Sequence, residues 1–153
     1  MIKMLASLVL LLVIPAAAAE TPYLPGRPGR TVVNDQAALQ RLLRNSGITL
    51  QWISFETRER GHVVATMYRG LLYLRGSQSG GLGRLTVEGE VLRVDSRSFT
   101  FRGRIVITGA PDADRNCVRD GTYEFRVTQR RRYWRLQDFE ACDGLADYVD
   151  IYF

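Results

Sequence analysis

The distribution of apolar residues from Ile48 onward is typical of a β-rich domain. Short apolar runs alternate with turn-forming residues, and the clearest run, residues 98–108, has mainly phenylalanine and isoleucine at odd positions and mainly threonine and arginine at even positions. Such period-two alternation predicts half-buried antiparallel strands. We expect seven to eight strands, near residues 48–56, 62–68, 70–76, 84–94, 98–108, 121–128, 131–138 and 146–152.

The strand at 98–108 is expected to pair with the strand before it, with Leu92 opposite Phe101. In this register, the apolar residues that begin the earlier strand fall on the wrong face. A β-bulge at Gly89 returns them to the buried face, because a bulge shifts the alternation by one residue.

One helix is predicted before the strands. Asn34 or Asp35 caps it, leucines share one face as far as Asn45, and Gly47 ends it. Residues 20–31 contain three prolines and two glycines, so we expect them to form an extended leader.

These elements predict one mainly β domain over residues 32–153. The expected architecture is a small antiparallel β-barrel, or a strongly curved sheet, of seven to eight strands with one N-terminal α-helix. A two-sheet β-sandwich is the alternative. Closure of the sheet into a barrel is favoured, because an open sheet of eight strands leaves the backbone groups of its edge strands unpaired.

The first nineteen residues have the pattern of a signal peptide. Lys3 gives a positive start, residues 4–14 form an apolar run, and Ala17 with Ala19 forms a small-x-small cleavage site. We therefore expect cleavage after Ala19 and a soluble periplasmic or secreted product. The apolar run is shorter than the roughly 20 residues that span a bilayer, so we expect no stable membrane anchor.

Charge adds a preference for acidic partners. Lys3 is the only lysine, so the processed chain carries 20 arginines against 16 acidic residues, a net charge of +4. This excess favours an anionic envelope component, such as acidic lipid or polysaccharide. The arginines are spread along the chain, so a solvated surface is the favoured interpretation, and we expect no nucleic-acid partner. The basic residues 130–135 and the acidic residues 140–150 are expected to neutralise each other on neighbouring strands. The oligomeric state is left open.

Cys117 and Cys142 are the only cysteines, and export makes a disulfide their expected state. If the last long hairpin places Phe125 opposite Trp134, the same register places the two cysteines opposite each other. The Cα atoms of opposed strand residues are about 4.5–5.5 Å apart, a distance that a disulfide spans. A redox couple is the alternative, but the spacing is not C-x-x-C.

Asp112, Asp114 and Asn116 spell D-x-D-x-N, the opening of a calcium loop and the one candidate metal motif. The glycine and the bidentate glutamate that such a loop needs are replaced by Cys117 and Tyr123. An ordinary turn is therefore favoured, and we expect no metal and no other cofactor.

His62 is the sole histidine and stands at the start of a predicted strand. A hydrogen-bonding role is favoured over a catalytic one. No serine has a partner base, and no carboxylate pair has a spacing that compels acid–base chemistry. We predict no catalytic residue and favour a non-enzymatic protein, with enzyme status uncertain.

The C-terminal sequence DYVDIYF alternates cleanly and places Tyr148, Asp150 and Tyr152 on one face. Tyrosines that flank a carboxylate can bind a sugar or a cation. Together with Trp134 or Trp52 they are the candidate ligand-binding residues. The alternative is that these side chains simply complete a sheet.

The segments NCVRDGTYEFRV, RRYWRLQ and CDGLADYVDIYF resemble a group of uncharacterised exported bacterial proteins that end in similar strands rich in tyrosine and tryptophan. The resemblance implies export and a shared β-rich domain, and it carries no activity. It also implies that Trp134, Tyr148, Asp150 and Tyr152 belong to a defining C-terminal unit.

The leading functional hypothesis is an exported, non-enzymatic module that binds a small ligand or an envelope component. It predicts an apolar cavity of a few hundred Å3 lined by tryptophan and tyrosine. A protein-interaction or inhibitor module is the alternative, and it predicts a solid core with an exposed apolar or arginine-rich patch. A hydrolase or lyase is the third hypothesis, and it requires His62 or the acidic C-terminal segment to converge in one cleft.

Overall fold

The structure of the protein, a computed structural model, describes residues 29–153. The predicted signal peptide, residues 1–19, and most of the predicted leader lie outside the described residues. The elements in chain order are β1 (Val32–Val33), α1 (Gln36–Leu43), β2 (Ile48–Leu50), α2 (Gln51–Ser54), β3 (His62–Tyr68), β4 (Leu71–Gly80), β5 (Gly83–Val94), β6 (Ser98–Thr108), β7 (Asn116–Arg126), β8 (Tyr133–Leu136) and β9 (Val149–Tyr152).

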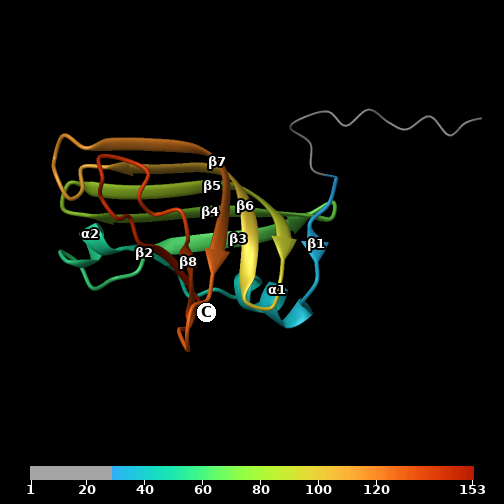
Figure 1. Cartoon of the computed structure of the whole chain (residues 1–153). Helices are drawn as coiled ribbons and strands as arrows, with labels where there is room; N and C mark the ends of the chain where they lie inside the picture. Colours follow the sequence, from blue (N-terminus) through green and yellow to red (C-terminus); the bar gives the residue numbers. More distant parts are fainter. Residues whose placement is uncertain (1–28) are drawn as a thin grey trace, which may run out of the picture.

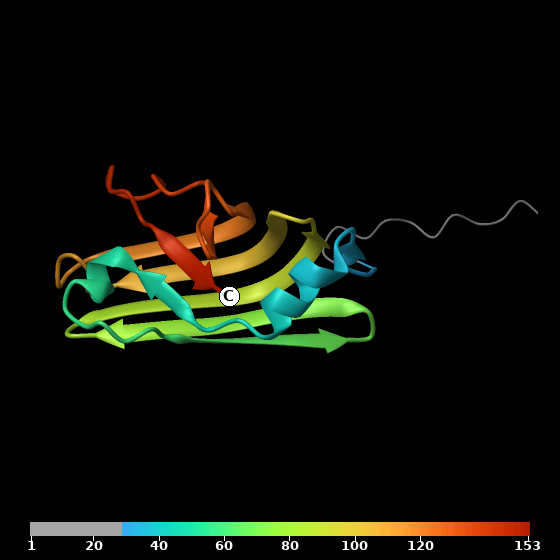
Figure 2. The same ribbon diagram turned by 90° about the horizontal axis from the view of Figure 1, so that it is seen from below.

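The strands form one strongly curved sheet in the order β2-β9-β8-β7-β6-β5-β4-β3, and β1 pairs with β5 (Figures 1 and 2). Every neighbouring pair on this path is antiparallel. The two ends of the sheet meet where Ile48 and Gly61 exchange backbone hydrogen bonds of 3.1 and 2.8 Å. The sheet is therefore a nearly closed antiparallel barrel. This confirms the predicted fold class over the sandwich alternative.

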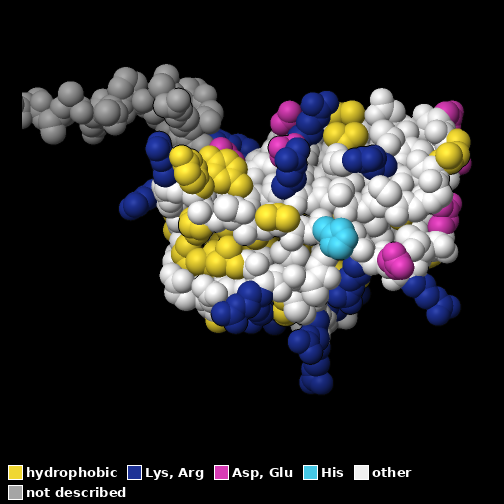
Figure 3. All heavy atoms as spheres, turned by 180° about the vertical axis from the view of Figure 1, so that it is seen from behind, with side chains coloured by type: hydrophobic (Ala, Val, Ile, Leu, Met, Phe, Trp, Pro, Cys, Tyr) yellow, Lys and Arg dark blue, Asp and Glu magenta, His cyan; other side chains and the backbone are white. Residues whose placement is uncertain are grey.

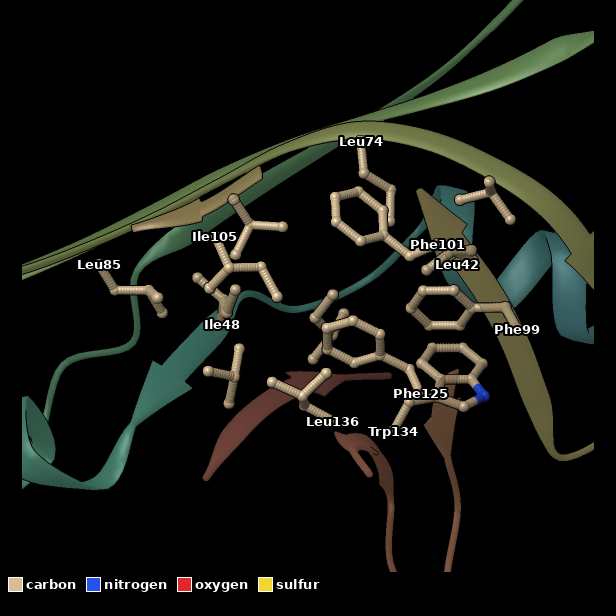
Figure 4. Packing of buried hydrophobic residues seen from close by; sticks show 14 of the residues in the cluster. Leu42, Ile48, Leu74, Leu85, Phe99, Phe101, Ile105, Phe125, Trp134 and Leu136 are labelled. Atoms are coloured by element: carbon tan, nitrogen blue, oxygen red, sulfur yellow. The ribbon is translucent and has the colours of Figure 1, made fainter. Parts of the chain in front are cut away.

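The inward positions of the long strands fill the barrel with side chains (Figure 4). Phe99, Phe101, Phe125 and Trp134 are all at most 1% exposed. Phe99 stacks on Phe125 with ring centroids 4.9 Å apart, and Trp134 meets Phe99 edge-on at 5.6 Å. Burial of such rings supplies much of the hydrophobic stabilisation of a small domain.

Helix α1 covers part of this core, as the sequence predicts. The Asp35 carboxylate accepts a 2.6 Å hydrogen bond from the Ala38 N–H, so Asp35 is the N-cap. Leu39 and Leu42 are buried against the barrel. After the helix, Gly47 has a φ of 108°, a left-handed conformation that favours glycine.

Three glycines lie side by side across the inner face of the sheet. Gly89 pairs with Gly103, and Gly103 pairs with Gly121. A Cβ atom on Gly103 would lie 2.6 Å from the Gly89 Cα and 2.8 Å from the Phe101 ring. Tyr123 covers Gly121 in the same way, with its hydroxyl 3.1 Å from the position of a Cβ atom. The missing side chains thus make the space that the two rings occupy.

The expected bulge between β5 and β6 exists at a different residue. Val91 pairs with Phe101 and Arg93 pairs with Thr100, so Leu92 is the extra residue. The predicted site, Gly89, sits in the regular ladder. A bulge close to the β5–β6 turn places all the earlier core residues of β5 on the inner face of the sheet. This explains why the bulge lies at Leu92.

Two other predictions need correction. The strand expected over residues 48–56 ends at Leu50, and α2 follows, because the next buried apolar residue is Ile53, three positions on rather than two. Phe125 pairs with Leu136 instead of Trp134, a shift of two residues. The connection between β7 and β8 is a six-residue loop, residues 127–132, that lengthens the turn.

Alanine at Gly103 is expected to destabilise the fold, because its Cβ atom would overlap Gly89 and the Phe101 ring. We expect the Gly103→Ala variant to lose about 1–3 kcal/mol of unfolding free energy, as overpacked cores do, in urea titrations followed by circular dichroism. Gly29→Ala is the matched control, since nothing lies within 4 Å of its Cβ position. Equal stabilities of the two variants would contradict this account of the core.

Candidate functional site

The barrel interior is occupied by the protein's own side chains. Trp134, a predicted ligand-binding residue, is 1% exposed and packs between Phe99 and Phe153. In the part of the chain that the structure describes, four hollows of about 190–560 Å3 stand out, and neither Trp52 nor Trp134 lines any of them. The predicted cavity lined by tryptophan and tyrosine is therefore not among these hollows.

Tyr148, Asp150 and Tyr152 share the outer face of the C-terminal segment, and arginines of the protein contact the Asp150 carboxylate and both tyrosine rings. Arg135 donates two hydrogen bonds of 2.7 Å to the Asp150 carboxylate, and its guanidinium lies 4.2 Å from the centre of the Tyr148 ring. Arg60 lies 3.8 Å over the Tyr152 ring. The hydrogen bonds to Asp150 raise the pKa of Arg135 above its ordinary value. Arg135 faces Asp150 in the ladder, as predicted for the basic and acidic segments.

Trp52, the remaining predicted site residue, belongs to a buried ion-pair network. Arg115 donates two hydrogen bonds of 2.8 Å to the Asp147 carboxylate, and the Trp52 indole N–H donates a third of 3.0 Å. The Arg115 side chain is 2% exposed and that of Asp147 is fully buried. The hydrogen bonds that Arg115 donates to Asp147 raise the pKa of Arg115, outweighing the opposite effect of burial.

This network and the disulfide hold residues 137–148, which run between β8 and β9 without regular structure. Cys117 and Cys142 form the predicted bridge, with a Cα–Cα distance of 5.9 Å. Gln51 accepts a 2.7 Å hydrogen bond from the Tyr148 N–H and donates to the Ala146 carbonyl. The segment is thus tied to both β7 and α2.

The candidate calcium ligands lie near this segment but form no enclosed site. Asp112 and Asp114 are exposed in the loop before β7, and Asn116 is the first residue of that strand. Within residues 29–153, no group of three or more His, Cys, Asp or Glu side chains is placed to hold a metal ion.

A polar surface with two neighbouring hollows lies on the outside of the barrel, near the contact of β2 with β3. One hollow of about 350 Å3 lies over β3, β4 and β5, and another of about 520 Å3 lies at the contact of Ile48 with Gly61. His62 and Val64 line both hollows, so the two lie next to each other. We call this surface the seam groove. In Figure 3, His62 lies near the middle of the face, with arginines above and below it and apolar side chains to one side.

The seam groove is rich in arginine. Arg60 lies at its β2 side, and Arg75 and Arg84 project from the outer faces of β4 and β5. Glu88 is the only acidic residue that lines either hollow, and it lies 3.9 Å from Arg75 in a largely exposed pair. Among the described residues, Arg60 and Arg84 form no ion pair.

Hydroxyl and amide groups surround these cations. Ser77 and Thr86 face the groove from β4 and β5, and Asn45 and Ser46 line it beside β2. The sequence pattern did not predict these groove-lining residues, because they come from separate strands and from the loop before β2. Residues 75, 84 and 86 alternate with the buried residues of their strands, and this alternation is the sequence signal that places them on the outer face.

His62 does not meet the acidic C-terminal segment. No residue from 138 to 150 lines the seam groove, and the carboxylate that shares the groove with His62 is Glu88. The candidate residues of the hydrolase hypothesis, His62 and the acidic segment, therefore lie on different parts of the barrel.

The comparisons with known proteins place the chain in a family. A family model described as the PM1083 family matches residues 30–153. The chain belongs to the PM1083 family. A relative from Pasteurella multocida (strain Pm70), "Uncharacterized protein PM1083", is 35% identical over 115 residues, which are 74% of each chain. No solved structure matches the chain. Membership in the PM1083 family agrees with the predicted resemblance to an uncharacterised family and assigns no activity.

None of the helices in the described part of this PM1083-family protein is long and apolar enough to cross a membrane. The groups that the site offers are guanidinium, hydroxyl and amide groups on an open outer surface. Such groups suit recognition of an anionic, hydroxylated ligand by hydrogen bonds.

The ion pair of Arg115 and Asp147 is expected to be essential for stability in this PM1083-family protein. Asp147→Asn leaves a buried guanidinium with only the exposed Asp143 carboxylate as counter-charge, so we expect a loss of about 3–5 kcal/mol of unfolding free energy, measured by urea unfolding. Asp143→Asn is the control, because the Asp143 side chain is 63% exposed and lies 3.4 Å from Arg115. We expect the control to lose less than about 1 kcal/mol; an equal loss in both variants would refute a special role for Asp147.

Proposed function

We propose that this PM1083-family protein is an exported, non-catalytic binding module that takes an acidic saccharide of the cell envelope in the seam groove. The observation that carries the proposal is the contrast between a barrel filled by side chains and an outer groove in which Arg60 and Arg84 have no carboxylate partner among the described residues.

The chemistry of the groove supports a carboxylated or sulfated sugar. A guanidinium group offers a planar set of donors that fits a carboxylate or sulfate with two parallel hydrogen bonds. The hydroxyls of Ser77 and Thr86 can donate to and accept from sugar hydroxyls. The hollow over β3–β5, about 350 Å3, falls in the size range of small-ligand sites.

Two features support export. The first nineteen residues have the charge, apolar run and small-residue pattern of a signal peptide. The bridge between Cys117 and Cys142 is typical of proteins in oxidising compartments. An envelope location brings the arginine-rich groove close to acidic polysaccharides.

The ligand-binding role predicted for Trp52, Trp134, Tyr148, Asp150 and Tyr152 stays a prediction. We place the ligand in the seam groove instead, because Trp134 fills the core and the Asp150 carboxylate already accepts two hydrogen bonds from Arg135. A ligand at these residues would have to displace that internal pair.

A protein-interaction module is the second candidate function, and one observation favours it. Val64, Tyr68 and Tyr73 are 63%, 57% and 40% exposed, and they lie on the outer face of β3 and β4 beside the seam groove. Together with the solid core, this apolar surface fits the prediction made for an interaction module.

The saccharide proposal is tested with the double variant Arg60→Gln/Arg84→Gln. We expect its affinity for an immobilised acidic polysaccharide, polygalacturonate, to fall about tenfold or more, because each change removes charge-assisted hydrogen bonds. Neutral dextran is expected not to bind the unmodified protein. Surface plasmon resonance in low and high salt measures both expectations.

The matched control is Arg58→Gln/Arg126→Gln, which removes the same charge from exposed positions outside the groove. An equal loss of affinity in this control would show attraction by net charge alone and refute a site in the seam groove. Absence of binding to any acidic saccharide, combined with capture of a protein ligand that Tyr73→Ser abolishes, would favour the interaction module instead.

A further inference from the structure

A second charged surface lies away from the seam groove, at the end of the barrel that carries α1. Consecutive antiparallel strands reverse direction, so the β3–β4, β5–β6 and β7–β8 connections all lie at this end. Arg97 donates to the Val127 and Gln129 carbonyls at 3.2 and 2.7 Å, which joins two of these connections. Arg41 of α1 donates to the Ser96 carbonyl at 3.0 Å. We call this surface the α1 end.

The α1 end has a large excess of positive charge. Two acidic residues lie there, Asp35 and Asp95, and their carboxylates accept hydrogen bonds from the Ala38 N–H and the Asn34 amide. None of its arginines forms an ion pair within residues 29–153. These arginines come from the segment before β1, from α1 and its end, and from the three connections: Arg30, Arg41, Arg44, Arg69, Arg97, Arg130, Arg131 and Arg132.

The opposite end of the barrel is acidic. It contains α2 and the loop after it, the β6–β7 connection and the segment between β8 and β9. Its charged residues are Glu56, Glu59, Asp112, Asp114, Asp138, Glu140, Asp143 and Asp147, against Arg58, Arg60 and Arg115. The barrel is therefore electrically polarised along its length, and an anionic surface attracts one end and repels the other.

Apolar side chains and a recess accompany the arginines. Val32 is 52% exposed, and Tyr68 is 57% exposed beside the β3–β4 connection. A recess of about 190 Å3 is lined by Arg41, Arg44 and Phe153 together with Gln40. The Arg41 Nε atom is buried and has no hydrogen-bond partner among the described residues.

We infer that the α1 end docks on a membrane surface rich in acidic phospholipids. The arginines bind headgroup phosphates, while Val32 and Tyr68 enter the interfacial layer of the bilayer, a region in which tyrosine is enriched. This association is peripheral and orients the protein with its acidic end away from the bilayer. It goes beyond the saccharide proposal and does not depend on the seam groove.

The test is vesicle co-sedimentation with the chain that begins at Glu20, which keeps every buried core residue and lacks the apolar segment of residues 4–14. We expect binding to phosphatidylglycerol vesicles, no binding to phosphatidylcholine vesicles, and release at high salt. The triple variant Arg130→Gln/Arg131→Gln/Arg132→Gln is expected to bind on the order of a hundredfold more weakly, since each arginine near an acidic bilayer strengthens binding about five- to tenfold.

The matched control is Arg58→Gln/Arg84→Gln/Arg104→Gln, which removes three exposed charges outside the α1 end, one of them the seam-groove residue Arg84. We expect it to bind vesicles almost as well as the unmodified protein, even if it loses saccharide binding. Equal weakening in both triple variants would overturn the proposal.

Two further measurements separate a lipid surface from other anions. Tyr68→Ser is expected to weaken vesicle binding without changing its salt dependence, because the side chain contributes no charge. Inorganic phosphate at equal phosphate concentration is expected not to displace the protein from vesicles. Full displacement, or an unchanged affinity of Tyr68→Ser, would overturn docking on a bilayer and indicate a free-anion site. Circular dichroism and unfolding midpoints verify that each variant is folded.

Discussion

The contact of Gly89, Gly103 and Gly121 across three neighbouring strands is the constraint on which the rest of the structure depends. The absence of three inward side chains lets the rings of Phe101 and Tyr123 lie flat along the strands, and these rings meet the other core aromatics. A filled interior leaves no lumen for a ligand. The hollows of the described part of the chain lie instead on the outer surface of the barrel and at its α1 end.

Much of the fold could be predicted because local patterns determine it. The alternation over residues 98–108 matches β6 at both ends, and Asp35 caps the predicted helix. The position of α2 could not be predicted, since Gln51 is held by backbone groups of residues 146–148, which are remote in sequence. The disulfide partners were predicted correctly from an incorrect register. Cys142 lies in the irregular segment after β8, which brings its Cα atom to 5.9 Å from that of Cys117 without continuing the β7–β8 ladder.

Less of the candidate site could be predicted, for a topological reason. Alternation placed Tyr148, Asp150 and Tyr152 on one face, but only the pairing of β8 with β9 shows that Arg135 already neutralises Asp150. Arg69 and Arg97 are far in sequence from each other and from the run at residues 130–132, and a spread of arginines along the chain suggests a solvated surface. Alternate hairpin connections return to the same end of an antiparallel barrel, so the fold collects these residues into one surface.

The outward parity of the groove-lining residues separates two kinds of constraint on the sequence. Arg75, Arg84 and Thr86 stand between core residues of their own strands but are not members of the buried hydrophobic cluster. A substitution at these positions alters the charge and shape of the outer surface, while the buried positions between them keep the packing of the barrel. One scaffold of this kind can therefore carry different outer surfaces.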